Sequence, residues 1–250
     1  MAAYDFASTR LFVDAPLAEG AELLLEDAQA NYVRNVMRMA AGDGLLLFNG
    51  RDGEWGARIS EVAKKRVTLV AERRTRPQTP AGKVRYLFAP LKHARLDYMV
   101  QKAVEMGASR LSPVITRRTQ ASRVNLERMR ANAVEAAEQC GVLALPEIDE
   151  PAPLARLLEG WPADAALAFC DEDSGAQDPV AALRPLADRP IAVLIGPEGG
   201  FDPEERAALL RLPSVVRLSL GPRILRADTA AVAALALVQA AAGDWRASGG

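Results

Sequence analysis

Short apolar runs alternate with turn-forming residues over roughly the first 70 residues of the chain. One helix interrupts these runs, because Tyr32, Val33, Val36 and Met37 recur at helical spacing and Asp27 is placed to cap their helix. The pattern predicts a small β-barrel with one or two helices. The predicted strands span residues 10–13, 21–25, 44–50, 54–59 and 66–70.

The rest of the chain follows a different pattern, in which apolar strands alternate with helices. Residues 73–82 are polar with two prolines and predict a linker to this second part. Leu96, Met99, Val100 and Val104 share one helical face that Gly107 can end, and a second helix is predicted at residues 126–140. This alternation predicts an α/β domain whose mainly parallel sheet is covered on both faces. The predicted strands span residues 84–89, 111–115, 165–169, 191–195 and 216–220.

A glycine-rich loop follows the predicted strand at residues 191–195. Three glycines in the sequence GPEGG, residues 196–200, let a ligand approach the main chain, and Asp202 with Pro203 predicts a helix start. Ligands of open α/β sheets bind at the carboxyl ends of strands, so the loop is a candidate pocket wall. Neither familiar phosphate-loop motif is present. A turn that only leads into the helix is the alternative.

A second loop follows the predicted strand at residues 216–220. Arg223 and Arg226 bracket the apolar pair Ile224 and Leu225, and two arginines beside a helix N-terminus suit an anionic ligand or transition state. Surface salt bridges are the alternative role for these arginines. Asp228 or Thr229 is placed to cap a helix made almost wholly of alanine and aliphatic residues, which predicts that this helix is buried in a core or an interface.

The charged residues are distributed unevenly along the chain. The chain has 31 Lys plus Arg and 32 Asp plus Glu, but residues 76–140 carry a net +7 and residues 141–250 a net −7. The near-neutral total therefore results from a basic segment and an acidic segment whose charges cancel. Two interpretations of this asymmetry stay open: a basic face that binds a polyanion, or two surfaces that are only solvated differently.

Two cysteines and one histidine exclude a disulfide framework and argue against a metal centre. The beginning of the sequence does not have the pattern of a secretory signal, so a cytoplasmic location is expected.

The two loop motifs, GPEGG and LGPRILRADTA, resemble those of the SPOUT methyltransferases, and within them the RsmE family. Further segments of the family occur in the same order: RLFVDAPL, NYVRNVMRMAAGDGLLLFNGRDGEW, KHARLDYMVQKAVEMGASRLSPVITRRT, and EAAEQCG followed by PEI. The resemblance implies a PUA-like RNA-binding β-barrel domain at residues 1–73, a linker at 74–82, and a trefoil-knot α/β methyltransferase domain with a mostly parallel sheet at 83–250. It also implies an S-adenosyl-L-methionine cofactor, no metal, a homodimer, and methylation of N3 of uridine 1498 of 16S rRNA in the 30S ribosomal subunit.

The family's roles extend to matching positions of this chain. Methylation of uridine N3 requires that its proton leave and that the uracil anion be stabilised, and the candidates are Arg226 for stabilising the anion and Asp228 or Glu198 for accepting or positioning the proton. Asp228 stands where the family usually has glutamate, which favours helix capping for it. The residues implied for cofactor binding are Leu194, Ile195, Gly196, Glu198, Gly199, Gly200, Leu220, Gly221, Ile224, Leu225 and Thr229.

RNA contacts are expected on both domains. The expected residues are Arg10, Arg34 and Arg38 on the barrel, and Lys92, Arg95, Lys102, Arg117, Arg118 and Arg123 on the basic segment. Some of these cations are expected only to solvate helix faces, without a specific contact to RNA. Cys140 is interpreted as a packed helix residue. His93 is interpreted as a structural or surface residue, with a contact to RNA as the alternative. Two other functions stay open: a related knotted methyltransferase acting on tRNA or on a ribose, and a non-catalytic RNA-binding adaptor of the same fold. The intact cofactor loops disfavour the adaptor, and the N-terminal barrel disfavours the related enzyme.

Overall fold

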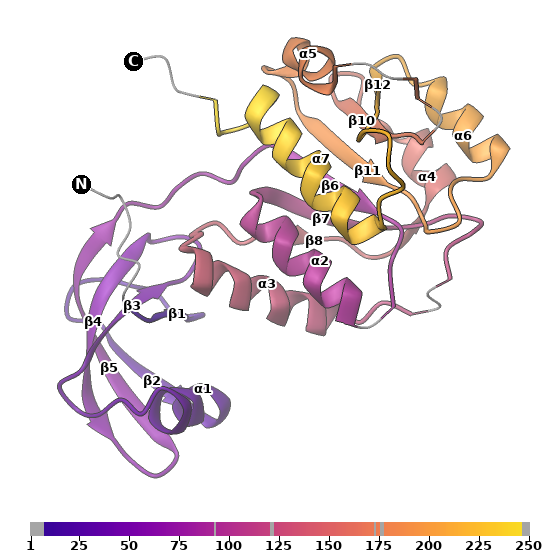
Figure 1. The fold of residues 1–250 in the computed structure, drawn as a ribbon. Coiled ribbons are helices and arrows are strands. Elements are labelled where there is room, and N and C mark those ends of the chain that lie inside the picture. The colour runs from indigo at the N-terminus through magenta and orange to yellow at the C-terminus, as the bar shows by residue number, and fades with distance from the viewer. Residues whose placement is uncertain (1–7, 93, 121–122, 173, 176–177, 247–250) are drawn as a thin grey trace. The chain divides into compact units, whose positions relative to one another are not determined.

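The structure is a computed structural model that describes residues 8–92, 94–120, 123–172, 174–175 and 178–246 (Figure 1). The chain forms two compact units. Unit 1 comprises Met1–Pro80 together with Ala137–Leu145, and unit 2 comprises Ala81–Ala136 together with Pro146–Gly250. The return of residues 137–145 to unit 1 was not predicted, since these residues continue a helix that begins in unit 2.

Unit 1 is built on a five-stranded sheet with the order β1-β3-β4-β5-β2. β1 and β3 pair in parallel and the other neighbours are antiparallel. The alternation along β2 places Leu23 and Leu25 in the core and leaves Leu24 half exposed. The strands span Arg10–Phe12 (β1), Glu22–Glu26 (β2), Gly44–Phe48 (β3), Glu54–Val62 (β4) and Arg66–Arg76 (β5), and the helices Asp27–Asn31 (α1) and Tyr32–Val36 (η1, a π-helix).

All five predicted strands of this unit are confirmed, with two differences at its boundaries. β5 continues to Arg76, so the first residues of the predicted linker belong to the sheet. Residues 137–145 are tied to the unit by polar contacts: Glu138 Oε1 accepts from the Phe12 amide at 2.8 Å, and the Gly141 carbonyl accepts from Arg76 Nη2 at 3.0 Å. The predicted single helix begins as α1 and continues as a π-helix, which sequence periodicity does not distinguish from an α-helix.

Unit 2 contains a parallel sheet with the order β12-β10-β11-β6-β7-β8, and β9 pairs with β7. The mainly parallel sheet predicted from the sequence is confirmed. The strands span Val84–Phe88 (β6), Ala108–Ile115 (β7), Glu147–Ile148 (β8), Ala152–Pro153 (β9), Ala166–Cys170 (β10), Ile191–Ile195 (β11) and Val215–Leu218 (β12). The helices span Ala94–Glu105 (α2), Leu126–Cys140 (α3), Leu154–Glu159 (α4), Pro179–Leu183 (α5), Arg184–Leu186 (η2, a 3₁₀-helix), Pro203–Leu210 (α6) and Ala227–Ala242 (α7).

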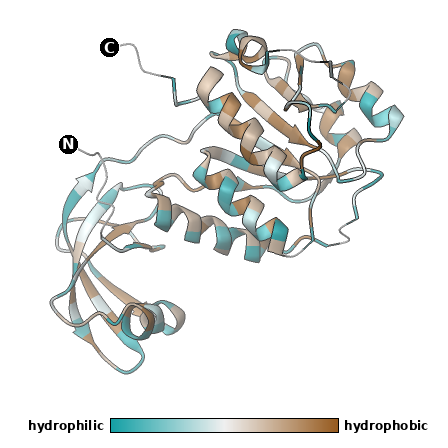
Figure 2. Cartoon of the chain, viewed as in Figure 1, coloured by the Kyte–Doolittle hydropathy of each residue, from teal (hydrophilic) through white to brown (hydrophobic). Residues whose placement is uncertain are grey.

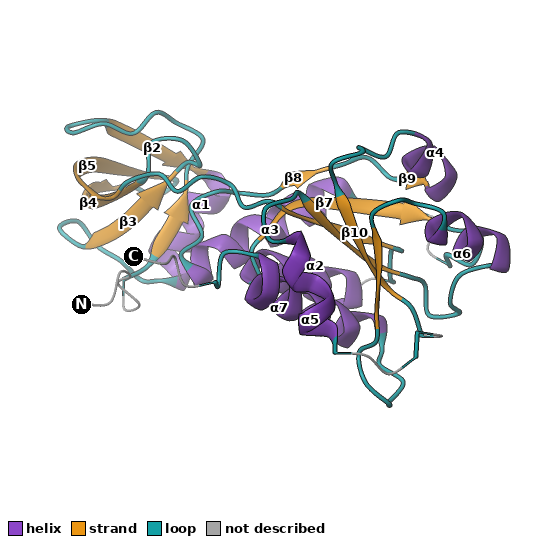
Figure 3. Ribbon diagram, turned by 90° about the horizontal axis from the view of Figure 1, so that it is seen from above, coloured by secondary structure: helices purple, strands orange, loops and turns teal. Residues whose placement is uncertain are grey.

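Helices cover both faces of this sheet (Figure 3). α4 and α6 pack on the face that carries Leu167 and Leu194, whereas α2, α5 and α7 form a layer on the opposite face. β10 and β11 are apolar along their length, as is much of α7 (Figure 2). None of the helices in the described ranges is long and apolar enough to cross a membrane.

α7 is the apolar helix that the sequence predicts to be buried. Ala234, Leu235 and Val238 have no exposed surface, and the side-chain amide of Gln239 donates to the Met106 carbonyl at 2.8 Å. That contact lies beside Gly107, which has a φ of 76° and ends α2 as predicted. α7 therefore lies against α2 as part of the core of unit 2.

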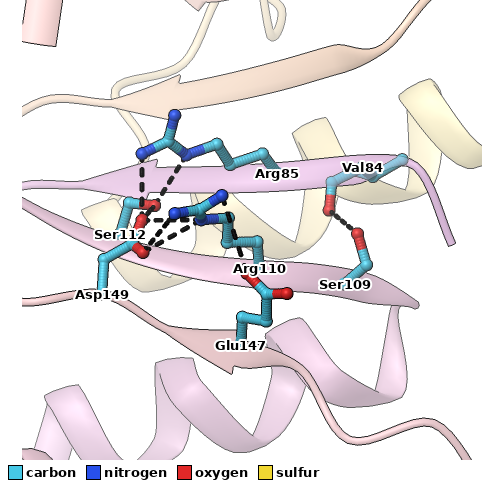
Figure 4. A network of polar contacts seen from close by, with 7 residues as sticks. All are labelled: Val84, Arg85, Ser109, Arg110, Ser112, Glu147 and Asp149. Carbon is cyan, nitrogen blue, oxygen red and sulfur yellow. Dashed lines mark hydrogen bonds and ion pairs between the residues drawn. The ribbon is translucent and has the colours of Figure 1, made fainter. Parts of the chain in front are cut away.

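A polar cluster fixes the short strand β8 to the edge of the sheet (Figure 4). Asp149 accepts hydrogen bonds from Arg85 Nη2 at 2.9 Å, Ser112 Oγ at 2.6 Å and Arg110 Nη2 at 2.7 Å. Burial works against the charge of Asp149, but these donors outweigh it and hold its pKa below the ordinary value. The cluster balances its charges internally and lies away from the strand ends that carry the glycine loop.

Candidate active site

Three neighbouring strands of unit 2 end beside one cavity. β12, β10 and β11 are adjacent in the sheet, and the residues after each of them line a cavity of about 940 Å³. The carboxyl edge of a parallel sheet is where α/β proteins bind ligands. Two of these segments are the loops predicted from the sequence, whereas the segment after β10, which includes Asp171, Glu172 and Ser174, was missed.

The glycine loop is shaped by close contacts of its main chain. A Cβ atom on Gly196 would lie 2.5 Å from the ring of Phe201, and Gly200 has a φ of +68°, which side-chain-bearing residues rarely adopt. The Gly200 amide donates to the Pro197 carbonyl at 2.9 Å and closes the turn. Asp202 then caps α6, and Pro203 occupies its first turn as predicted.

The second loop runs from the end of β12 to the start of α7. β12 ends at Leu218, two residues earlier than predicted, so that Leu220 belongs to the loop. Arg226 takes the N-cap position of α7 without a side-chain capping bond. The predicted cap at Asp228 or Thr229 is therefore wrong, because Asp228 lies inside the first turn. Its carboxylate accepts instead from the Thr229 amide at 2.9 Å.

Most of the predicted cofactor residues line the cavity. These residues are Ile195, Gly196, Glu198, Gly200, Leu220, Gly221, Ile224 and Leu225. Ile224 is fully exposed, which is unusual for a large apolar side chain and suits a surface that a ligand covers. The other predicted positions lie elsewhere: Leu194 is packed in the core on the α4 and α6 face, the Gly199 carbonyl accepts from Arg118 at 2.8 Å, and Thr229 is exposed on α7.

Arg95, in the first turn of α2, lies against both predicted acids. Its Nε donates to Asp228 Oδ2 at 3.1 Å, and its Nη1 donates to Glu198 Oε1. The hydrogen bond from Arg95 is the main cause that holds the pKa of Asp228 below its usual value, and burial opposes it. Asp228 is therefore ionised at neutral pH and is a weak base. The contact with RNA predicted for Arg95 stays a prediction, and the structure adds these two ion pairs to it.

The two cysteines lie in different environments. Burial raises the pKa of the Cys170 thiol to about 12, so it stays protonated at neutral pH. Cys140 is exposed at the end of α3, and the prediction that it is packed is wrong.

Among the described residues, no group of three His, Cys, Asp or Glu side chains is placed to hold a metal ion.

The predicted RNA contacts fall into different environments. Arg10 is buried, and its Nε donates to Glu54 Oε2 at 3.0 Å, so a contact between this side chain and RNA would have to displace a buried ion pair. Arg38 is exposed, with a φ of 57°, beside the π-helix. Arg34 donates to the carbonyls of Ala63 and Lys64 and ties this helix to the β4–β5 hairpin.

In unit 2 the predicted basic positions are also partly engaged. Lys102 pairs with Glu105 at 2.6 Å, and Arg117 pairs with Asp202 at 2.8 Å. Lys92 and Arg123 are exposed. His93 lies outside the described residues. Because Arg117 and Arg118 contact α6 and the glycine loop, changing their charge would disturb the glycine loop as well as any RNA contact.

Comparison with known proteins agrees with this geometry. The RNA methyltransferase domain family matches residues 77–239, and the RNA methyltransferase PUA domain family matches residues 25–72. A ribosomal RNA small subunit methyltransferase E of Rickettsia conorii is 30% identical over 232 residues, which cover 92% of this chain and 94% of the relative. The chain belongs to the RsmE family of RNA methyltransferases.

Solved structures of similar proteins share the fold. A putative methyltransferase of Legionella pneumophila, in complex with the cofactor S-adenosylmethionine, has a TM-score of 0.82 and 30% identity, and the match covers 95% of this chain and 99% of that one. An RsmE protein of Neisseria gonorrhoeae bound to S-adenosylmethionine has a TM-score of 0.83 at 24% identity, with the same coverage, and shows the fold alone. The α/β fold with a PUA-like N-terminal unit, predicted from the sequence, is confirmed.

Sequence reasoning in this RsmE family chain missed the segment after β10, and it named Arg95 only as an RNA contact and missed its position between the two acids. The segment after β10 gave a usable signal, because Asp171 and Glu172 directly follow a buried strand whose end had to lie at the same edge as the glycine loop. Arg95 gave none, since its partners lie 103 and 133 residues further along the chain.

Proposed function

We propose that this protein is an S-adenosyl-L-methionine-dependent methyltransferase that methylates N3 of a uridine in 16S rRNA, the position equivalent to uridine 1498. The observation that carries the proposal is the cavity between the glycine loop and the second loop, in a chain that belongs to the RsmE family. We propose further that the substrate is the assembled 30S subunit, that the enzyme acts in the cytoplasm as a homodimer with α7 in part of its interface, and that its methyltransferase domain is a trefoil knot.

The cavity residues fit this cofactor. Gly196 and Gly200 leave room for a ligand against the main chain, and backbone amides and carbonyls there can bind the adenine edge. Ile224, Leu225 and Leu237 supply apolar surface for the adenine faces. The bound cofactor supplies an electrophilic methyl group. The chain's own task is to bring a nucleophilic nitrogen to that methyl and to exclude water.

Uridine N3 carries a weakly acidic proton that must leave as the nitrogen attacks. We assign Glu198 as the proton acceptor or its positioning group, because it lines the cavity and its side chain is 47% exposed. Asp228, held ionised by Arg95, is assigned to positioning. Arg226 is exposed at the N-cap of α7, where it can stabilise the negative charge that develops on the uracil oxygens.

RNA contacts are proposed on each unit separately. On unit 1 we propose Arg34 and Arg38 with the tip of the β4–β5 hairpin, where Lys64, Lys65 and Arg66 are all exposed. On unit 2 we keep Lys92, Lys102, Arg117 and Arg118. These cations neutralise phosphates, so RNA affinity should fall steeply as salt rises.

Cofactor binding is tested by thermal unfolding with and without S-adenosylmethionine. A ligand that binds only the folded state at 100 times its Kd adds about 2.7 kcal/mol to the free energy of unfolding, so the melting temperature should rise by several degrees. S-adenosylhomocysteine should give a similar rise, and adenosine triphosphate should give none. An unchanged melting temperature at millimolar cofactor would favour the non-catalytic adaptor.

The substrate is tested by mapping N3-methyluridine in 16S rRNA from a strain that lacks this gene. The mark should disappear and should return when the wild-type gene is restored, but not when a Glu198→Gln, Arg226→Ala double variant is supplied. Purified enzyme should methylate 30S particles from the deletion strain. A mark that persists in a strain without a redundant enzyme would refute the substrate assignment and favour a related RNA target.

A further inference from the structure

One guanidinium joins the two loops that form the cavity walls. Glu198 belongs to the glycine loop, and Asp228 lies in the first turn of α7, directly after the second loop. Arg95 reaches both from α2, which follows the carboxyl end of β6. The two acids therefore share one cation that stands on a third, regular element of the same unit.

We propose that Arg95 is a positioning residue that couples the two walls of the cofactor cavity. It holds the glycine loop and the second loop in the relative position that methyl transfer requires. The proposal rests on the proposed function for its catalytic consequence, whereas the coupling of the walls is a property of the protein alone. Arginine suits this role because its rigid fork of donors can hold two carboxylates at once, which the single ammonium of lysine does with less directional control.

The loops need such a tie because neither has regular secondary structure. Residues 196–202 and 219–226 contain no helix or strand, so few backbone hydrogen bonds fix them. Arg118 holds the glycine loop through the Gly199 carbonyl, but that contact does not reach the second loop. Among the contacts described for Glu198 and Asp228, those with Arg95 link one loop to the other.

The geometry favours a positioning role over a contribution to global stability. The side chains of Arg95, Glu198 and Asp228 are 33%, 47% and 17% exposed, and ion pairs as exposed as these change global stability little. A small displacement of a wall, in contrast, separates the cofactor from the attacking nitrogen and slows transfer strongly. Loss of Arg95 should therefore affect the loops and the reaction more than the fold.

Hydrogen exchange of the ligand-free protein tests the coupling directly. In Arg95→Gln, exchange of the hydrogen-bonded amides at the two loops, Gly200 within residues 196–202 and Ala230 directly after residues 219–227, should both rise about tenfold, as expected for loops that open more easily. Glu198→Gln should raise exchange mainly in the first segment, and Asp228→Asn mainly in the second. The matched control is Arg128→Gln, which removes an exposed ion pair with Asp97 of 2.6 Å in the same unit and should change neither loop.

Cofactor affinity and kinetics test the consequence. Arg95→Gln should raise the Kd of S-adenosylmethionine about tenfold and lower kcat about 10- to 100-fold, while Arg95→Lys should recover part of both losses. Adding Asp228→Asn to Arg95→Gln should cost little more, because the coupling is already lost. If exchange and affinity in Arg95→Gln match those in Arg128→Gln, the proposal is wrong. A wild-type protein that binds no cofactor would instead refute the proposed function and leave the exchange test intact.

Discussion

Replacing Glu54 with alanine should lower the free energy of unfolding by about 3–5 kcal/mol, the usual cost of removing one partner from a buried ion pair. The side chain of Glu54 is 3% exposed and lies among donors from three residues of unit 1. It accepts from Arg10 Nε at 3.0 Å, Arg76 Nη2 at 2.6 Å and Thr75 Oγ1 at 2.8 Å. Alanine would remove the carboxylate that compensates the buried charge of Arg10.

The matched control is Glu72→Ala in the same sheet. Glu72 pairs with Arg58 at 2.7 Å, but both side chains are about half exposed, so this change should cost about 1 kcal/mol or less. Urea unfolding followed by circular dichroism measures both variants. A Glu54→Ala variant as stable as Glu72→Ala would mean that the buried network does not stabilise unit 1.

The same network predicts how stability depends on pH. Burial of Glu54 raises its pKa, but hydrogen bonds from Arg76, Thr75 and Arg10 outweigh burial and lower the pKa overall. A carboxyl group with a lowered folded pKa stabilises the protein above its unfolded pKa of about 4.3, and this stabilisation is lost as pH falls through the folded value. The difference in unfolding free energy between wild type and Glu54→Gln should therefore be large at pH 7 and shrink below about pH 4.

The fold was largely predictable because its longer elements have clear periodicity. β11 and α3 occur at the predicted residues. A five-residue apolar run is typical of a buried strand and a long amphipathic pattern is typical of a helix, so each pattern indicates one type of element. The two-residue strands β8 and β9 were missed because they are defined only by their pairing with β7. The return of residues 137–145 to unit 1 was missed for a similar reason, since contacts across more than 60 residues establish it.

The part of the candidate site formed by glycines could be predicted from the sequence, whereas the part formed by ion pairs could not. Gly196 and Gly200 mark their loop in any reading of the sequence, because side-chain-bearing residues do not fit there. Arg10 and Arg95 look like ordinary surface cations, and only the tertiary structure shows that one is buried against Glu54 and the other bridges two acids. Local sequence cannot specify partners this distant, so it does not show which cations are already held in ion pairs.

The shape of the glycine loop leads to a second prediction with a large effect, which concerns Gly196→Ala. The new Cβ would lie 2.5 Å from the Phe201 ring, well inside contact distance. Phe201 packs edge-on against Phe169 with ring centroids 5.3 Å apart, so a shift of its ring disturbs this contact with the core beneath the cavity. We expect a loss of about 1–3 kcal/mol of stability, typical of overpacking, and at least a tenfold loss of affinity for S-adenosylmethionine.

Gly199→Ala is the matched control, because the same methyl group three residues later makes only ordinary van der Waals contacts. Its nearest neighbour would be Arg118 Cδ at 3.8 Å, an ordinary contact, so stability should change by about 0.5 kcal/mol or less. Calorimetric titration with the cofactor and urea unfolding measure both variants. Phe201→Leu in the Gly196→Ala background should restore part of the stability, since a smaller side chain relieves the overlap. If Gly196→Ala binds the cofactor as tightly as wild type, this glycine does not shape the cofactor wall, and the wall must be assigned to the second loop and the segment after β10 instead.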